Sequence, residues 1–310
     1  ILKLPYKRYL LKKNFFPFLH VFDLYIKIFK EILWHSNSSL YVSGILTIII
    51  TALLPINKRR KFIILRNDIR RLSFLQQKLF KFSLTKVDKV FTNNIFNHRY
   101  LNRYTPQNKS VFTFDYPKYN KDFVERRIET IKNKKNDLIT IVVIASMRPI
   151  KNPEGTAQFI NLVSKSRKDV KFILIGNNQK QFIAKFLDSK VLEKVFFTGV
   201  KTKEEIKIIL LSANYLLSLS FSEGNPNSVI EAMSNGIPCI LSNILPHQYL
   251  SDGESNHIIS LENLSKEATL ISKKISLKDS IGLRSHNVRK RILDLSKKYL
   301  NLINAIDYNL

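Results

Sequence analysis

Residues 138–146 read LITIVVIAS, a continuous apolar run with polar residues on either side. A run of this kind is typical of a central strand in a parallel sheet, because helices cover both faces of such a strand. Helical patterns and further β-rich runs alternate after it, which predicts a doubly wound α/β domain with six strands. The other five runs are KFILIGNN (171–178), KVFFTG (194–199), YLLSLS (215–220), IPCILS (237–242) and NHIISL (256–261). The helices between them are expected at 153–164, 179–187, 203–212 and 229–235.

The first half of the chain shows the same alternation less regularly. Apolar residues recur at helical spacing over 40–54 and over 71–82, which predicts two helices. A stretch with many charges and few large apolar residues, 118–137, then separates the two halves. The β-rich runs before it are EILWHS (31–36), KFIIL (61–65), DKVFTN (88–93) and SVFTFDY (110–116).

A chain of 310 residues exceeds the usual size of a single hydrophobic core, so two domains are expected. We predict an amino-terminal Rossmann-like domain, a charged linker, a second Rossmann-like domain, and a carboxy-terminal helix that packs back toward the first domain. Their predicted limits are 1–120, 121–137, 138–283 and 284–310.

The chain is strongly basic, with 51 Lys and Arg against 24 Asp and Glu, a net charge of +27. The charge is uneven, since residues 1–140 hold 28 basic and 9 acidic residues. Such a field attracts polyanions or an anionic membrane surface. An amino-acid usage rich in Lys, Ile, Asn and Phe explains the charge equally well.

Cysteine and hydropathy patterns limit the setting of the protein. Cys239 is the single cysteine, so neither a disulfide within the chain nor a cysteine-based metal site can form, and a reducing, cytosolic setting is expected. The apolar run 44–55 is shorter than the roughly 20 residues that span a bilayer. The first 22 residues lack the uninterrupted apolar core of a signal peptide.

Residues 222–238, SEGNPNSVIEAMSNGIP, predict a short helix with a ligand site at its start. We take Asn225 as the N-cap, Pro226 as the first helical residue and Gly236 as the residue just past the end. The free amides of the first turn suit a phosphate. Glu223 precedes that turn and Glu231 lies inside the helix, so two carboxylates could bind hydroxyl groups on either side of the phosphate. A nucleotide sugar has this shape.

The same stretch resembles the signature of the group 1 (family 4) glycosyltransferases, in which two glutamates lie within EG-x-P-x-x-x-x-EA-x-x-x-G-x-P. SMRPIKN (146–152), ILIGNN (173–178) and VFFTGV (195–200) resemble further elements of that family. The resemblance is good over about 136–261 and loose in the first half. It implies a GT-B fold, two Rossmann-like domains with the active site between them. The fixed positions that match are Glu223, Gly224, Pro226, Glu231, Ala232, Gly236 and Pro238.

The resemblance also implies roles for the residues of the second domain. Glu223 would contact hydroxyls of the transferred sugar, Glu231 the ribose hydroxyls, and the amides at Asn227 and Ser228 the diphosphate. Lys151 would neutralise the diphosphate. Ser146 stands where the commonest pattern has an arginine, and Arg148 is the candidate substitute. The resemblance thus makes Glu223, Lys151 and Arg148 the predicted catalytic residues. The remaining expected donor contacts are Gly224, Asn225, Pro226, Gly176 and Gly199.

No cofactor is expected, and no metal site, because the sequence has no Asp-x-Asp and no histidine cluster with metal spacing. The resemblance implies that the amino-terminal domain holds the acceptor. The candidates there are His35, at the end of the run 31–36, and Arg66 and Asp68, which follow the run 61–65. The strand, loop and helix that open the relatives are expected before Tyr6 and are not seen, so we expect a truncated amino-terminal domain.

The resemblance implies a glycosyltransferase that retains the anomeric configuration. The predicted function is the metal-independent transfer of a sugar from a UDP- or GDP-sugar to a glycan or polyprenyl-lipid-linked acceptor in bacterial surface polysaccharide synthesis. Basic and aromatic residues interleave over 3–30 and 58–81, which favours peripheral attachment to the inner face of the plasma membrane. Two alternatives stay open. One is a basic nucleic-acid-binding protein, and the other is a relic that binds nucleotide sugars without full catalysis.

Overall fold

A computed structural model describes residues 40–43, 61–65, 69, 73–92, 95–104, 110–112, 121–134 and 137–307. The chain divides into two compact units. The first comprises Ile1–Phe91 and Tyr100–Val111, and the second comprises Thr92–Arg99 and Phe112–Leu310.

The described part of the first unit contains a four-stranded sheet in the order β1-β2-β3-β4. Its strands are β1 (Leu40–Ser43), β2 (Lys61–Leu65), β3 (Lys89–Thr92) and β4 (Ser110–Phe112), and β1 pairs with β2 in parallel. Two helices belong to this region of the chain, α3 (Phe74–Thr85) and α4 (Ile95–Tyr104).

The predictions for this half have mixed outcomes. Strands β2, β3 and β4 and helix α3 are confirmed. The helix predicted over 40–54 is wrong at its start, because Leu40–Ser43 forms strand β1, and the rest of that range lies outside the described residues. The strand predicted at 31–36 also lies outside them. Helix α4 was not predicted, since its sequence IFNHRYLNRY has few aliphatic residues to mark a helical period.

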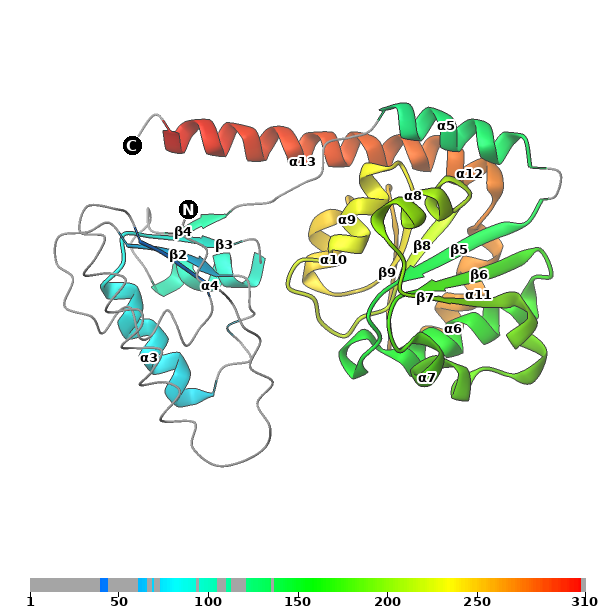
Figure 1. Cartoon of the computed structure of the whole chain (residues 1–310), viewed down its shortest axis with the longest axis horizontal. Helices are drawn as coiled ribbons and strands as arrows, with labels where there is room; N and C mark the ends of the chain where they lie inside the picture. Colours follow the sequence, from blue (N-terminus) through cyan, green and yellow to red (C-terminus); the bar gives the residue numbers. More distant parts are fainter. Residues whose placement is uncertain are drawn as a thin grey trace. The chain divides into compact units, whose positions relative to one another are not determined.

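The second unit contains a six-stranded sheet in the order β10-β9-β8-β5-β6-β7 (Figure 1), and every strand pair recorded for it is parallel. This confirms the predicted fold class and all six predicted strands. The strands are β5 (Ile139–Ile144), β6 (Val170–Ile175), β7 (Val195–Gly199), β8 (Tyr215–Ser218), β9 (Cys239–Ser242) and β10 (His257–Ile259).

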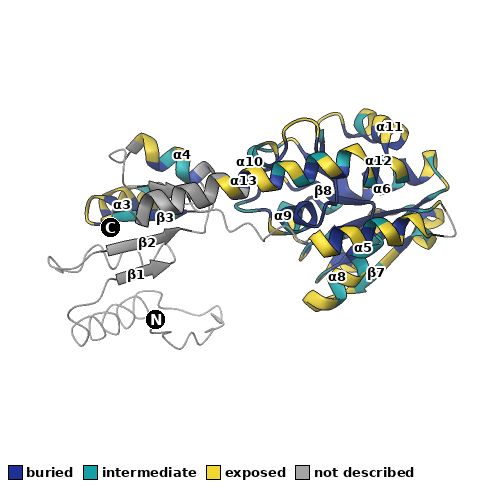
Figure 2. Ribbon diagram, turned by 90° about the horizontal axis from the view of Figure 1, so that it is seen from above, coloured by how far each residue is buried: buried dark blue, intermediate teal, exposed yellow. Residues whose placement is uncertain are grey.

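Helices cover both faces of this sheet, and β5 shows why its sequence is apolar throughout. Ile141 and Val143 point into a core shared with α6 (Pro153–Ser166) and α11 (Leu264–Lys274). Val142 points into the opposite core, which α5 (Lys121–Lys132), α8 (Lys203–Leu211), α9 (Asn227–Ser234), α10 (Leu245–Leu250) and α13 (Leu283–Asp307) share. Figure 2 shows the buried sheet between helices whose outer faces are exposed. The shorter helices are α7 (Gln179–Ile183) and α12 (Leu277–Ile281), with 3-10 turns at Pro149–Lys151, Ala184–Phe186 and Ser189–Lys194.

The segment predicted as a charged linker contains helix α5, which packs on the second unit. Arg127 is fully buried at its centre. Its guanidinium donates to the carbonyl oxygens of Ala213 (2.9 and 3.0 Å), Gly236 (3.2 Å) and Ser280 (3.2 Å). These carbonyls lie at or just past the carboxyl ends of α8, α9 and α12, where the helix dipoles are negative. Burial lowers the pKa of Arg127 to about 9.

Within the described residues, no helix is both long enough and apolar enough to cross a bilayer.

Candidate active site

The candidate site lies at the point where the order of the strands reverses. After β5 the chain builds β6 and β7 on one side and then returns to place β8 on the other side. The crevice beyond the carboxyl ends of two such strands is where open α/β sheets bind ligands. The loop after β5 carries Lys151, and the loop after β8 carries Glu223. The amide of Phe221 donates to the carbonyl oxygen of Ile150 at 3.0 Å, which ties the two loops together.

An ion pair joins these loops. Nζ of Lys151 lies 2.6 Å from Oε1 of Glu223, and the two side chains are 21% and 9% exposed. The hydroxyl of Ser220 donates to the same oxygen at 2.6 Å. Breaking a pair this buried leaves an uncompensated charge, so each partner holds the other in place. The structure therefore brings together two of the three predicted catalytic residues, which are 72 positions apart in sequence.

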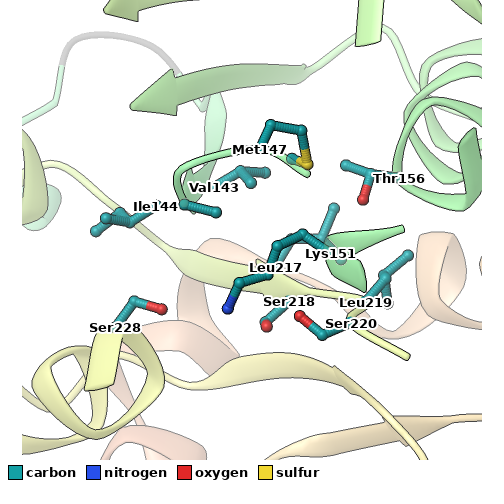
Figure 3. Close-up of a pocket in the computed structure, with 11 residues that line it drawn as sticks. Val143, Ile144, Met147, Lys151, Thr156, Leu217, Ser218, Leu219, Ser220 and Ser228 are labelled. Carbon is teal, nitrogen blue, oxygen red and sulfur yellow. The ribbon is translucent and has the colours of Figure 1, made fainter. Parts of the chain in front are cut away.

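A small pocket lies beside this pair (Figure 3). Apolar side chains from the ends of β5 and β8 form one part of its wall, and Lys151, Ser218, Ser220 and Ser228 bring polar groups to it. The remaining lining residues are Val143, Ile144, Ala145, Met147, Thr156, Leu217 and Leu219.

Helix α9 brings Ser228 to the pocket, and its start differs by one residue from the prediction. Pro226 occupies the N-cap position and Asn227 is the first helical residue, so the assignment of Asn225 as N-cap is wrong. Proline has no amide hydrogen, and its carbonyl instead accepts from the amides of Val229 and Ile230, both at 3.0 Å. The amide of Asn227 donates to the carbonyl of Asn225 at 2.9 Å.

An anion at the start of α9 would bind to an amide that has no acceptor within the helix. Because the Asn227 amide is already used, the amide of Ser228 is the one in the first turn that has no carbonyl acceptor in the described structure. Gly236, at φ +69°, ends the segment as predicted.

A second layer of polar residues supports the loop that carries Glu223. The hydroxyl of Ser242 donates to the carbonyl oxygen of Ser220 at 2.6 Å. Nδ1 of His247 lies 3.2 Å from that hydroxyl and 3.1 Å from the carbonyl oxygen of Ser242. Burial lowers the pKa of His247 to about 4, so the ring is neutral at pH 7, although the charge of Glu223 acts in the opposite direction.

Ser220, Ser242 and His247 were not among the site residues predicted from the sequence. The signal available for Ser220 and Ser242 was their position at the ends of predicted strands. His247 had a similar signal, since it lies just past the strand that ends at Ser242, but a lone histidine in a helix is usually structural.

Gly176 and Gly199 adjoin one another at the ends of β6 and β7. The amide of Gly176 donates to the carbonyl of Gly199 at 2.8 Å. Both have positive φ, +129° and +70°. A Cβ atom at Gly176 would lie 2.1 Å from the carbonyl oxygen of Ala145. Gly176 thus allows the end of β6 to lie close to the backbone that follows β5. Donor binding by these two glycines stays a prediction.

The other predicted site residues are placed as follows. Arg148 is exposed in the loop that carries Lys151, and Glu231 is partly exposed on α9. Gly224 and Asn225 lie in the loop between Glu223 and the helix, and Nδ2 of Asn225 donates to Oδ1 of Asn227 at 2.7 Å. His35, Arg66 and Asp68 lie outside the described residues. The described residues contain no group of three or more His, Cys, Asp or Glu side chains that could hold a metal ion.

Solved structures with the same architecture cover most of the chain. Anabaena HepE, solved with UDP and glucose, superimposes with a TM-score of 0.71 at 13% identity over 96% of this chain and 84% of that one. The lipopolysaccharide outer core galactosyltransferase WaaB gives 0.69 at 13% identity over 94% and 81%. TarM gives 0.66 at 19% identity over 85% of this chain and 54% of that one. Together with the parallel six-stranded sheet of the second unit, these likenesses define an α/β protein of the GT-B class.

Sequence comparison gives the family. Residues 124–274 match the model of the family described as glycosyl transferases group 1, and this part of the chain belongs to that family. The UDP-Gal:alpha-D-GlcNAc-diphosphoundecaprenol alpha-1,3-galactosyltransferase of Escherichia coli is 23% identical over an alignment of 187 residues, and the match covers 58% of this chain and 46% of that protein. The chain thus spans about half the length of this curated relative.

Proposed function

We propose that this protein is a retaining glycosyltransferase that moves a hexose from a UDP- or GDP-sugar to a glycan or a polyprenyl-lipid-linked acceptor. The observation that carries the proposal is the Lys151–Glu223 pair beside the start of α9. A cation, a carboxylate and a helix amide meet there at the crevice of a doubly wound sheet.

The donor's diphosphate binds at the start of α9, on the amide and hydroxyl of Ser228. The ammonium of Lys151 faces it from the neighbouring loop. Ser228 and Lys151 line the same pocket, which supports this placement. Arg148 can add a second cation from the same loop, because its side chain is exposed. Glu231, partly exposed four residues further along α9 than Asn227, binds the ribose hydroxyls.

Glu223 binds hydroxyls of the transferred sugar. Its Oε1 already accepts from Lys151 and Ser220, so Oε2 is the oxygen that would accept from the sugar. As the bond between sugar and phosphate breaks, negative charge grows on the diphosphate and positive charge on the sugar ring. The ammonium and the helix amide stabilise the first, and the carboxylate stabilises the second. These groups are fixed before the reaction, so little reorganisation is needed. The acceptor oxygen bonds to the anomeric carbon from the face that the phosphate leaves, which retains the configuration, and the departing phosphate takes the proton of that acceptor hydroxyl.

The relatives support the choice of substrates. The Escherichia coli relative is named for a UDP-galactose donor and a diphosphoundecaprenol-linked acceptor, and WaaB is named as a lipopolysaccharide galactosyltransferase. A role in surface polysaccharide synthesis, at the cytoplasmic face of the plasma membrane, follows from an acceptor of this kind. His35, Arg66 and Asp68 remain the candidates for the acceptor side.

Calorimetric titration with UDP, GDP and a single-stranded oligonucleotide tests the donor site. We expect one nucleoside diphosphate to bind and Glu231→Gln to weaken it, with Glu262→Gln, an exposed acid near the end of the sheet, as the control. Tight oligonucleotide binding whose affinity is the same in Glu231→Gln would instead favour the nucleic-acid alternative. Transfer assays with a panel of nucleotide sugars then separate an active enzyme from a relic that only binds them.

A further inference from the structure

Helix α3 in the first unit has two different faces. Phe80 and Leu84 point inward, where they are buried with Val87, Val90 and Leu101. The opposite face exposes large apolar side chains that this core does not use. Their exposed fractions are 73% for Phe74, 66% for Leu75, 37% for Leu79 and 50% for Phe82. Single exposed apolar residues are ordinary, but four within three helical turns form a patch, and such patches mark interaction sites.

Lysines interleave with this apolar face. Phe74, Lys78 and Phe82 follow one another at four-residue spacing, so they form one stripe along the helix. Nζ of Lys78 lies 4.6 Å from the ring centroid of Phe74, and Nζ of Lys86 lies 5.9 Å from that of Phe82. Over 73–104 the sequence has six Lys and Arg and one acidic residue, Asp88, a net charge of +5. The surface is apolar and cationic at once.

This combination decides between kinds of partner. Lysine is depleted at the centre of protein–protein interfaces, where aromatic residues and arginine are enriched. Single-stranded nucleic acids need aromatic stacking platforms, whereas half of the exposed apolar residues on α3 are leucines. Helices that lie in the bilayer interface carry Phe and Leu on one face and lysines that extend to anionic headgroups. We propose that the outward face of α3 docks on a membrane surface that contains anionic lipid.

Docking of this face would hold the protein at the membrane surface where the proposed lipid-linked acceptor lies. It does not depend on sugar transfer, because lipid binding can be measured without any donor or acceptor. Membrane docking by α3 and sugar transfer can therefore be tested, and can fail, independently of each other.

Co-sedimentation of the full chain with vesicles tests it, using phosphatidylcholine alone and phosphatidylcholine mixed with phosphatidylglycerol. We expect binding to the anionic vesicles that weakens with salt. Phe74→Ser combined with Phe82→Ser should lower the partition coefficient by roughly tenfold. Lys78→Gln should lower it about fivefold. Phe196→Ser combined with Ile208→Ser, which changes exposed apolar residues of the second unit, is the matched control and should have no effect.

A second measurement follows the helix directly. Leu79→Cys can be labelled with an environment-sensitive fluorophore, because the native Cys239 is buried. Its emission should shift to the blue on anionic vesicles, whereas a label at Ile208→Cys should not shift. Two results would overturn the proposal. One is equal binding to neutral and anionic vesicles, and the other is unchanged binding of a folded protein that carries both phenylalanine substitutions. A dimer in solution that the same change dissolves would also overturn it, since a second copy would then cover this face.

Discussion

Arg127 donates a hydrogen bond from Nη1 to the carbonyl oxygen of Gly236 at 3.2 Å, and this contact joins α5 to the end of α9, the helix whose start forms the candidate donor site. The hydroxyl of Ser285 on α13 donates to the same oxygen at 2.8 Å. Both helices thus fix α9 at its carboxyl end. The position of α9, and with it that of Ser228 at its start, therefore depends on residues outside the pocket.

Arg127→Met should destabilise the protein by about 3 kcal/mol or more, because several buried carbonyls lose a charged donor at once. Arg126→Met, an exposed neighbour on α5, should change the free energy of unfolding by less than about 0.5 kcal/mol. Denaturant unfolding of both variants measures the difference. Equal free energies of unfolding for the two variants would show that the buried guanidinium does not stabilise the protein.

Lys151→Met and Glu223→Gln should affect binding and turnover in different ways. Removing the ammonium should weaken UDP binding by about tenfold or more, since a charge-assisted contact to phosphate is lost. Removing the carboxylate charge frees the ammonium and should leave UDP affinity unchanged or higher, while transfer falls by a factor on the order of 100. Calorimetry and initial rates separate the two effects. Equal losses of affinity in both variants would contradict the assignment of the cation to the diphosphate.

Stability should fall in mild acid because two histidines are buried. Burial lowers the pKa of His247 and of His257 to about 4, below the value of about 6.5 expected in the unfolded chain. Between these values the unfolded chain binds more protons than the native one, so the free energy of unfolding falls as the pH falls through this window. The loss from about pH 7 to about pH 5 should be about 2 kcal/mol for each histidine.

Thermal or denaturant unfolding against pH checks this prediction. His257→Asn should flatten the profile, and His286→Asn, an exposed histidine on α13, should leave it as it was. A profile that does not change in His257→Asn would mean that this ring does not titrate between the two states as expected.

Gly176→Ala should cost about 2 kcal/mol or more, because the added Cβ would overlap the carbonyl oxygen of Ala145 at a positive φ. Gly253 offers a matched control, since it also has a positive φ, +87°, but has no atom within 4 Å of the added Cβ. Gly253→Ala should therefore cost only about 1 kcal/mol. Denaturant unfolding of the two variants measures the two losses of stability. If the losses are equal, the close approach of the ends of β5 and β6 is not what requires a glycine at position 176.

The sequence predicted the second unit well because its elements are marked by local periodicity. Runs of apolar residues identify all six strands, and Gly236 marks the end of α9. The prediction failed where one helical face is heavily charged. In α5 the residues Phe123, Val124 and Ile131 have helical spacing, but the charges between them made the segment look like a linker. The start of α9 was misplaced by one residue because Asn225 and Pro226 are both compatible with a helix start.

The sequence by itself determined the α/β class, the order of the strands along the chain, and the loop and helix that carry Glu223 and Ser228. These depend on contacts between residues close in sequence. Only the tertiary structure decided that Lys151 pairs with Glu223 and that Arg127 binds the carbonyls at three helix ends. Those partners lie 72 or more positions apart. Lys151 and Glu223 meet because the parallel sheet brings the carboxyl ends of β5 and β8 to one edge, whereas Ala213 and Gly236 precede the amino ends of β8 and β9, at the opposite edge.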